Sequence, residues 1–285
     1  MKPAATLQVC TLNPRRGWET STKHAQPAHH GKAVLAGLGL LLLAGCGDGA
    51  AGLERLSPGE HGRVADVSSG DVVVLDSGLV VRLAGIETPY AGEPGGEVAR
   101  EDLTRRVKGR VVELLYGGAR RDARGRALAQ LRLESGGWIQ GALLRDGVAE
   151  VRTYADNRAM ADPMLADEAR ARIAARGLWG HGPWGEAVFK VRLPGEIGSQ
   201  TSGFQIVEGR VADVTRTAPG TYLDFNAQHQ GFAALVASSA EPEFAAADKA
   251  APSLQGRLIR LRGAIGWNGL MRIDHPEQIE LLKPR

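Results

Sequence analysis

The chain has 285 residues, of which 43% are hydrophobic and 24% are charged, a composition typical of globular proteins that excludes a collagen-like or disordered chain. The length suffices for about two domains, each with its own core. The formal net charge is +3, but residues 1–46 hold five of the 35 basic and one of the 32 acidic residues, leaving a remainder near neutrality. Overall charge therefore gives no evidence of nucleic-acid binding.

The N-terminal region carries the pattern of a leader. The apolar run at 33–45, "AVLAGLGLLLLAG", has 13 residues, short of the ~20 needed to cross a bilayer, and it follows several basic residues. The next residue completes "LAGC", which resembles a bacterial lipobox. We expect residues 1–46 to be a signal peptide with a lipobox and Cys46 to be acylated, so that the protein is lipid-anchored in the bacterial cell envelope, facing the periplasm or the exterior. The alternative is a plain secretory signal with an incidental cysteine.

Beyond the leader, the chain predicts a flexible tether and then a first domain. We expect the Gly-rich residues 47–59 to form the tether and residues 60–180 to form the domain. Short valine-rich segments predict strands, and amphipathic segments predict helices. The expected strands are 62–67, 71–76, 79–86, 110–116, 127–133 and 148–154, and the expected helices are 96–109, 138–147 and 164–177. This order favours a mainly β, α+β fold with a five-stranded barrel of the OB type.

A second domain is predicted after a linker at 181–202. Residues 209–214 repeat the "GRVADV" of 62–67, and short β-like runs follow at similar spacing. We therefore expect a second small OB-like β-barrel at 203–285, with a sandwich of about five strands as the alternative. Its aromatic residues are either core residues or stacking platforms for bases; they are Tyr222, Phe225, Phe232 and Trp267.

Four blocks in the first domain occur in a recognisable order. They are "SSGDVVVL", "VRLAGIETP", "RRDARGRALAQL" and "WIQGALLRDGVAEV". Together they resemble the thermonuclease family, the staphylococcal nuclease-like domains, over about residues 60–180. The resemblance implies hydrolysis of phosphodiester bonds in DNA or RNA. It also implies Ca²⁺ ligands at Asp71, at Glu87 and at the carbonyl of Thr88, with Arg82 and Arg126 holding the phosphate.

Each of these residues alone also has a structural interpretation. Asp71 after Ser-Gly is a natural turn residue. Arg82 could be a surface charge, and Arg126 belongs to a run of arginines that could instead form a patch for a nucleic-acid backbone. The ordered match of all four blocks favours a site derived from a nuclease.

Three positions depart from the family pattern. Ser69 stands where an outer carboxylate is common, and Glu87 replaces a shorter aspartate. Most important, Tyr90 occupies the position of the glutamate that acts as general base. A phenol with a pKa near ~10 cannot accept a proton at neutral pH as a carboxylate does. We expect either a weakened calcium-dependent nuclease, with Glu93 as a candidate substitute base, or an inactive lipoprotein that binds nucleic acid or another polyanion; an envelope scaffold is a third possibility.

Overall fold

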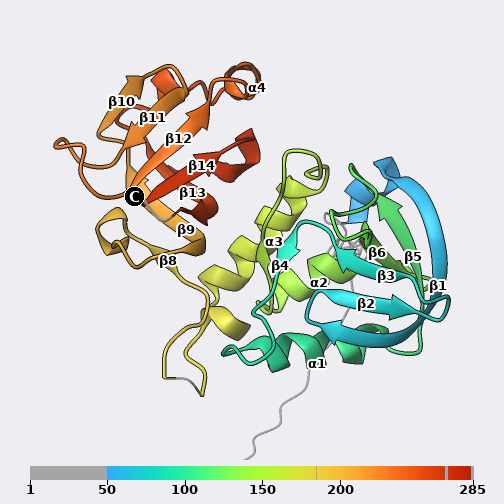
Figure 1. Cartoon of the computed structure of the whole chain (residues 1–285). Helices are drawn as coiled ribbons and strands as arrows, with labels where there is room; N and C mark the ends of the chain where they lie inside the picture. Colours follow the sequence, from blue (N-terminus) through green and yellow to red (C-terminus); the bar gives the residue numbers. More distant parts are fainter. Residues whose placement is uncertain (1–49, 184, 267–268, 284–285) are drawn as a thin grey trace, which may run out of the picture. The chain divides into compact units, whose positions relative to one another are not determined.

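The computed structural model describes residues 50–183, 185–266 and 269–283 (Figure 1). The expected leader and Cys46 lie outside these residues, as does Trp267. Both folded domains belong to one compact unit, Ala44–Arg285. In the described part of the chain, every helix is too short or too polar to cross a bilayer.

The first domain is a closed five-stranded barrel, as predicted. Its hydrogen-bonded order is β1-β2-β3-β6-β5, and β3 and β6 are the parallel pair. The first half of β1 pairs with β5 and its second half pairs with β2, so one long strand closes the barrel. The strands are β1 (Ser57–Ser69), β2 (Val72–Leu75), β3 (Val80–Leu83), β5 (Val111–Tyr116) and β6 (Ala127–Leu133).

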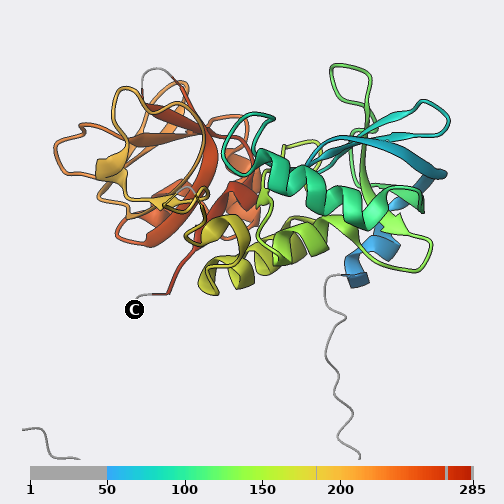
Figure 2. The ribbon, with the colours of Figure 1, turned by 90° about the horizontal axis from the view of Figure 1, so that it is seen from below.

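Two helices pack on the barrel strands, and a third packs against the second of these. They are α1 (Gly96–Val107), α2 (Ile139–Arg145) and α3 (Ala161–Ile173), with a 3-10 turn, η2, at Gly177–Trp179. Figure 2 shows α1 in green beside the barrel strands and α3 in yellow-green, which packs against α2 and β7 (Glu150–Val151). Leu103 and Val107 of α1 and Leu143 of α2 are buried in the same core as the inward-facing barrel residues. A two-stranded ribbon of β4 (Ile86–Glu87) and β7 (Glu150–Val151) completes the domain.

The tether predicted for 47–59 is wrong over its described part. Residues Ala50–Arg55 form a 3-10 helix, η1, and β1 begins at Ser57. Leu53 and Leu56 are 2% and 7% exposed and belong to the core of the first domain. The Gly-rich composition concealed these two leucines, whose burial fixes the segment to the barrel.

The second domain contains an eight-stranded sheet, and the expected OB-like barrel stays a prediction there, although the strand order parallels that of the first barrel. Its main path runs β10-β11-β12-β14-β13-β9-β8, with β15 added beside β13. Only residues 211–212 separate β9 from β10, so one broken strand provides both ends of the path from β10 to β9, as β1 does in the first barrel. Strands β12 and β14 are parallel, matching β3 and β6. The elements are β9 (Gly203–Arg210), β10 (Asp213–Arg216), β11 (Gly220–Asp224), β12 (Ala233–Ala237), α4 (Glu241–Ala246), η4 (Ala251–Leu254), β13 (Leu258–Ile265), β14 (Leu270–Ile273), η5 (Pro276–Gln278) and β15 (Ile279–Leu281).

The six-residue sequence repeat occupies the same structural position in both domains. In each copy it lies where the long strand changes partners. The valine N–H donates to an arginine carbonyl at 2.9 Å in Val64–Arg110 and at 3.0 Å in Val211–Arg257. The arginines of the repeat, Arg63 and Arg210, each donate to the carbonyl of a glycine with positive φ. The two copies of the sequence repeat therefore also adopt the same local structure.

The linker predicted at 181–202 is also partly structured. It contains β8 (Val191–Arg192), which pairs with β9, and a 3-10 turn, η3, at Pro194–Glu196. Phe189 packs on Trp179 with ring centroids 5.3 Å apart, within a small core shared by η2 and β9. Of the aromatic residues in the second domain, Phe232 is 3% exposed and packs against Phe225, as core residues do.

Candidate active site

Asp71, Arg82 and Glu87 meet at one edge of the first barrel. The guanidinium of Arg82 forms an ion pair with Asp71 and a second one, at 2.9 Å, with Glu87 Oε2. Asp71 and Glu87 are buried, at 7% and 8% exposure. Burial lowers the pKa of Arg82 from its ordinary value, while the charge of Glu87 opposes that shift. The sequence-predicted carboxylates and one phosphate arginine are thus brought together.

Local structure places these groups. Asp71 lies in the turn between β1 and β2, and Ser69 Oγ donates to its Oδ1 at 2.7 Å, so the serine orients the carboxylate. Gly70 lets the turn approach its neighbours closely: a Cβ there would lie 2.6 Å from Ala99 Cβ and 2.7 Å from Thr88 Oγ1. Thr88, the third predicted metal ligand, is 3% exposed beside this turn. The absence of a side chain at position 70 therefore permits the arrangement.

Tyr90 lies against the cluster as a hydrogen-bond donor. Its hydroxyl donates to Glu87 Oε1 at 2.9 Å, although 65% of the residue is exposed. This hydrogen bond to a carboxylate raises the pKa of the Tyr90 phenol above its ordinary value. The residue at the expected base position is consequently protonated at neutral pH and donates its proton to Glu87.

Glu93 is exposed and held in its own loop. Its carboxylate accepts the backbone N–H of Tyr90 at 2.8 Å. Among the contacts of the described residues, none joins Glu93 to Asp71, Arg82 or Glu87. Glu93 does line the same cleft as Glu87 and Tyr90. The structure therefore places it near the site without the contact that a substitute base would make.

Arg126 is paired with its own turn. Its guanidinium contacts Asp122 Oδ2 at 2.7 Å, and its charge is among the influences that lower the pKa of Arg82. Other arginines of the run are also neutralised: Arg121 pairs with Glu60 at 2.6 Å, and Arg132 pairs with Glu113 at 2.7 Å. The predicted basic patch is therefore largely compensated, and binding a phosphate would require Arg126 to leave Asp122.

Arg152, which no sequence motif had marked as a site residue, also contacts Glu87. Its Nη1 lies 2.9 Å from Glu87 Oε1, and its guanidinium lies 5.5 and 5.3 Å from the ring centroids of Tyr154 and Phe204. Arg152 follows the block "WIQGALLRDGVAEV" by one residue, which was the available signal. Its neighbour Glu150 faces Glu87 across the ribbon, and burial raises the pKa of Glu150 to about 8.

A cleft of about 790 Å³ opens beside Glu87. Its lining combines residues of the first domain with residues of the 186–204 segment and β13. The lining includes Glu87, Tyr90, Glu93, Glu150 and Arg152. The cleft therefore reaches the cluster at Glu87, whereas Asp71 and Arg82 are not among its lining residues.

The donor atoms suit a hard cation such as Ca²⁺. Asp71 and Glu87 offer carboxylate oxygens, and Thr88 offers its carbonyl. The carboxylates of Asp71 and Glu87 lie on either side of one cation, the guanidinium of Arg82, which contacts both of them. In the searched part of the chain, no three acidic, histidine or cysteine residues are grouped as a metal site. The residues fit the ion chemically, provided that backbone oxygen or water completes its coordination.

Comparison with known families agrees with this geometry. Residues 80–181 match the family described as staphylococcal nuclease homologue. The matched segment includes Arg82, Glu87, Tyr90 and Arg126, whereas Asp71 precedes it although it belongs to the same closed barrel. A search of curated proteins found no match. The chain therefore contains a domain of the staphylococcal nuclease homologue family at residues 80–181.

Proposed function

We propose that the first domain hydrolyses phosphodiester bonds of DNA or RNA with the help of Ca²⁺, and that its turnover is slow. The observation that carries the proposal is the cluster of Asp71, Arg82 and Glu87 at the edge of a nuclease-family barrel, with the Tyr90 hydroxyl on Glu87. The cluster supplies carboxylates for a cation and guanidinium for a phosphate. Position 90 supplies a proton donor in place of a base.

In this proposal, different residues bind the phosphate and the cation. Arg82 and Arg126 bind the phosphate by exchanging a carboxylate partner for a phosphate oxygen, which their forked guanidinium groups allow. Asp71, Glu87 and the Thr88 carbonyl hold the cation. Bound calcium would lower the pKa of a water and offset the negative charge of the phosphate. Arg152 keeps one oxygen of Glu87 oriented through its contact at 2.9 Å.

Cleavage of a single-stranded oligonucleotide tests this function. Residues 47–285 are incubated with DNA or RNA, with calcium or with a chelator. We expect weak, calcium-dependent cleavage, and we expect Tyr90→Glu to accelerate it by roughly 10²- to 10⁴-fold, the usual contribution of a positioned base. Tyr90→Gln is the matched control, since it has the shape of glutamate without the carboxylate. Absence of cleavage in both wild type and Tyr90→Glu would refute catalysis.

The second candidate function is binding without turnover. Its supporting observation is that the base position holds Tyr90, whose hydroxyl donates to Glu87, while the arginines that could contact a phosphate, Arg82 and Arg126, are present. Such a module binds nucleic acid or another polyanion with an affinity that falls with salt. Fluorescence anisotropy of a labelled oligonucleotide measures this, and an Arg82→Ala, Arg126→Ala double variant should lose the salt-dependent part. Binding with no cleavage in any variant would favour this candidate.

We further propose that residues 1–46 direct the protein to the cell envelope and that Cys46 carries the lipid anchor. The "LAGC" sequence after a 13-residue apolar run supports this. Metabolic labelling with a fatty acid measures acylation. Cys46→Ser should abolish the label and release the protein from the membrane fraction, whereas equal labelling of both forms would refute the assignment.

A further inference from the structure

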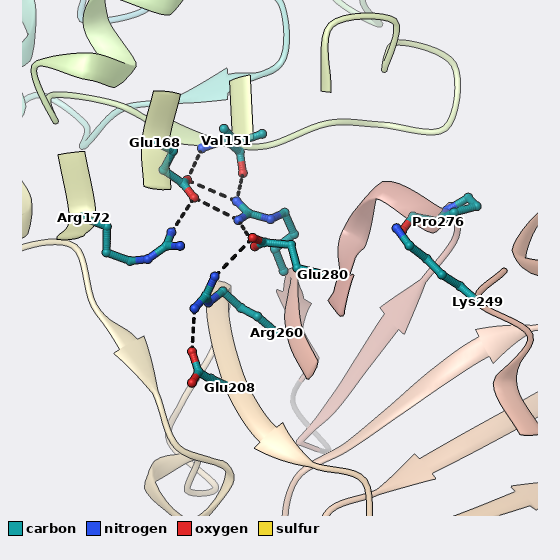
Figure 3. Close-up of polar contacts among 9 residues, drawn as sticks. Val151, Glu168, Arg172, Glu208, Lys249, Arg260, Pro276 and Glu280 are labelled. Atoms are coloured by element: carbon teal, nitrogen blue, oxygen red, sulfur yellow. Dashed lines mark hydrogen bonds and ion pairs between the residues drawn. The ribbon is translucent and has the colours of Figure 1, made fainter. Parts of the chain in front are cut away.

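A buried ionic network joins the second domain to helix α3 of the first (Figure 3). Arg262 on β13 donates to both oxygens of Glu168 at 3.1 and 2.9 Å and to Glu280 Oε1 at 2.7 Å. The side chains of Arg262 and Glu168 are 1% and 0% exposed. Charges so far from water are stable only with their partners in place, so the geometry of this network is narrowly defined.

The network ends on the backbone of Val151 in β7. The N–H of Val151 donates to Glu168 Oε1 at 2.7 Å, and its carbonyl accepts Arg262 Nη1 at 3.0 Å. Strand β7 has only two residues and pairs with the equally short β4. A ribbon of this size has little stability of its own. The side chains of Ile86 and Val151 are buried in the core of the first domain, and the two contacts to the Val151 backbone add polar restraints on the position of β7.

The same ribbon carries Glu87 of the candidate site. Ile86 pairs with Val151, and Glu87 pairs with Glu150. The next residue, Arg152, donates its N–H to the Gly85 carbonyl at 2.9 Å and places Nη1 2.9 Å from Glu87. A shift of the Val151 backbone would consequently move Arg152 away from Glu87.

We propose that Arg262 of the second domain is a positioning residue for the phosphodiester site of the first. By holding the Val151 carbonyl, it fixes β7 and, through β7, the contact between Arg152 and Glu87. This inference rests on the proposed function of that site. It also assigns the second domain a role: one of its strands completes the support of the site.

Two conservative variants of the full chain separate positioning from general stability. Arg262→Lys keeps a positive charge near Glu168, but a single ammonium cannot reproduce the forked contacts to Val151, Glu168 and Glu280. Arg260→Lys is the matched control. Arg260 lies on the same strand, is 9% exposed and pairs with Glu280 and Glu208, and none of its described contacts involves Val151.

Two measurements report on the ribbon and on the site. Hydrogen exchange of the peptide containing Val151 and Arg152 reports on the ribbon, and we expect Arg262→Lys to accelerate it about tenfold, because one buried carbonyl loses its donor. Terbium luminescence sensitised by Tyr90, which contacts Glu87, reports on the cation site. We expect terbium affinity to fall by roughly three- to tenfold in Arg262→Lys. Arg260→Lys should stay within about twofold of wild type in both measurements.

The outcomes distinguish the inference from the proposed function. Faster exchange in Arg262→Lys alone, with weaker terbium binding, supports the inference. Unchanged exchange at Val151, or equal acceleration in the two variants, overturns it even if the wild type cleaves nucleic acid. If the wild type binds no terbium and no oligonucleotide, the proposed function fails, and positioning of a phosphodiester site fails with it.

Discussion

Substitution of either member of the Glu168–Arg262 ion pair should lower the free energy of unfolding by an amount that the structure allows us to predict. Arg262→Met leaves Glu168 buried, with Arg172 at 3.0 Å as its remaining cation, and leaves the Val151 carbonyl without the donor it had. Breaking a buried pair costs about 3–5 kcal/mol, and we expect the lower end because Arg172 remains. Glu168→Gln should cost less, about 1–3 kcal/mol, because Arg262 keeps Glu280 at 2.7 Å.

The double variant completes a thermodynamic cycle. With glutamine at position 168, loss of Arg262 no longer leaves a buried carboxylate without its partner. The double variant Glu168→Gln, Arg262→Met should therefore be more stable than the sum of the two single costs implies. The coupling energy expected for side chains in direct contact is about 0.5–3 kcal/mol.

Urea unfolding followed by both tryptophan fluorescence and circular dichroism measures these free energies. With a slope of about 3 kcal/mol per M, a loss of about 3 kcal/mol lowers the midpoint by about 1 M. An Arg262→Met cost below about 1 kcal/mol, or strict additivity in the cycle, would refute the view that this pair is buried and mutually dependent.

Three further predictions address the first domain. Leu53→Ala should cost about 2–5 kcal/mol because Leu53 is 2% exposed in the core, whereas Glu54→Ala should change stability by less than about 1 kcal/mol; equal small effects in urea unfolding would indicate a tether after all. Gly70→Ala should cost about 1–3 kcal/mol of unfolding free energy, since the new methyl would displace Thr88 or Ala99, and it should weaken the proposed calcium binding in calorimetry. Gly198→Ala, whose methyl would meet nothing within 4 Å, is its control, and an unchanged stability in Gly70→Ala would contradict the close approach. Because burial raises the pKa of Glu150 from 4.5 to about 8, the folded state retains this proton longer than the unfolded state, so stability should decline as pH rises through that window; Glu150→Gln should flatten the decline in melting temperature, and parallel pH profiles would contradict the shift.

Much of the local structure followed from the sequence. Strand β6 has the bounds expected from its apolar pattern, and α1 begins at the expected residue, because both signals are local periodicities. Composition gave the wrong expectation for residues 50–59 and part of 181–202, where the glycine and proline content suggested an exposed, flexible chain. There a few apolar side chains, Leu53, Leu56 and Phe189, outweigh the polar background by entering cores formed by distant residues.

By itself, the sequence predicted, through the resemblance of its ordered blocks, that Asp71, Arg82 and Glu87 belong to one nuclease-like site, and it placed a phenol at position 90. Only the tertiary structure decided how these groups are partnered. Arg152 reaches Glu87 from β7, Arg126 turns to Asp122, and Arg262 reaches Val151 from 111 residues away. The physical reason is that ionic and hydrogen-bond partners are selected by distance and burial after folding, and neither quantity is encoded in the spacing of residues along the chain.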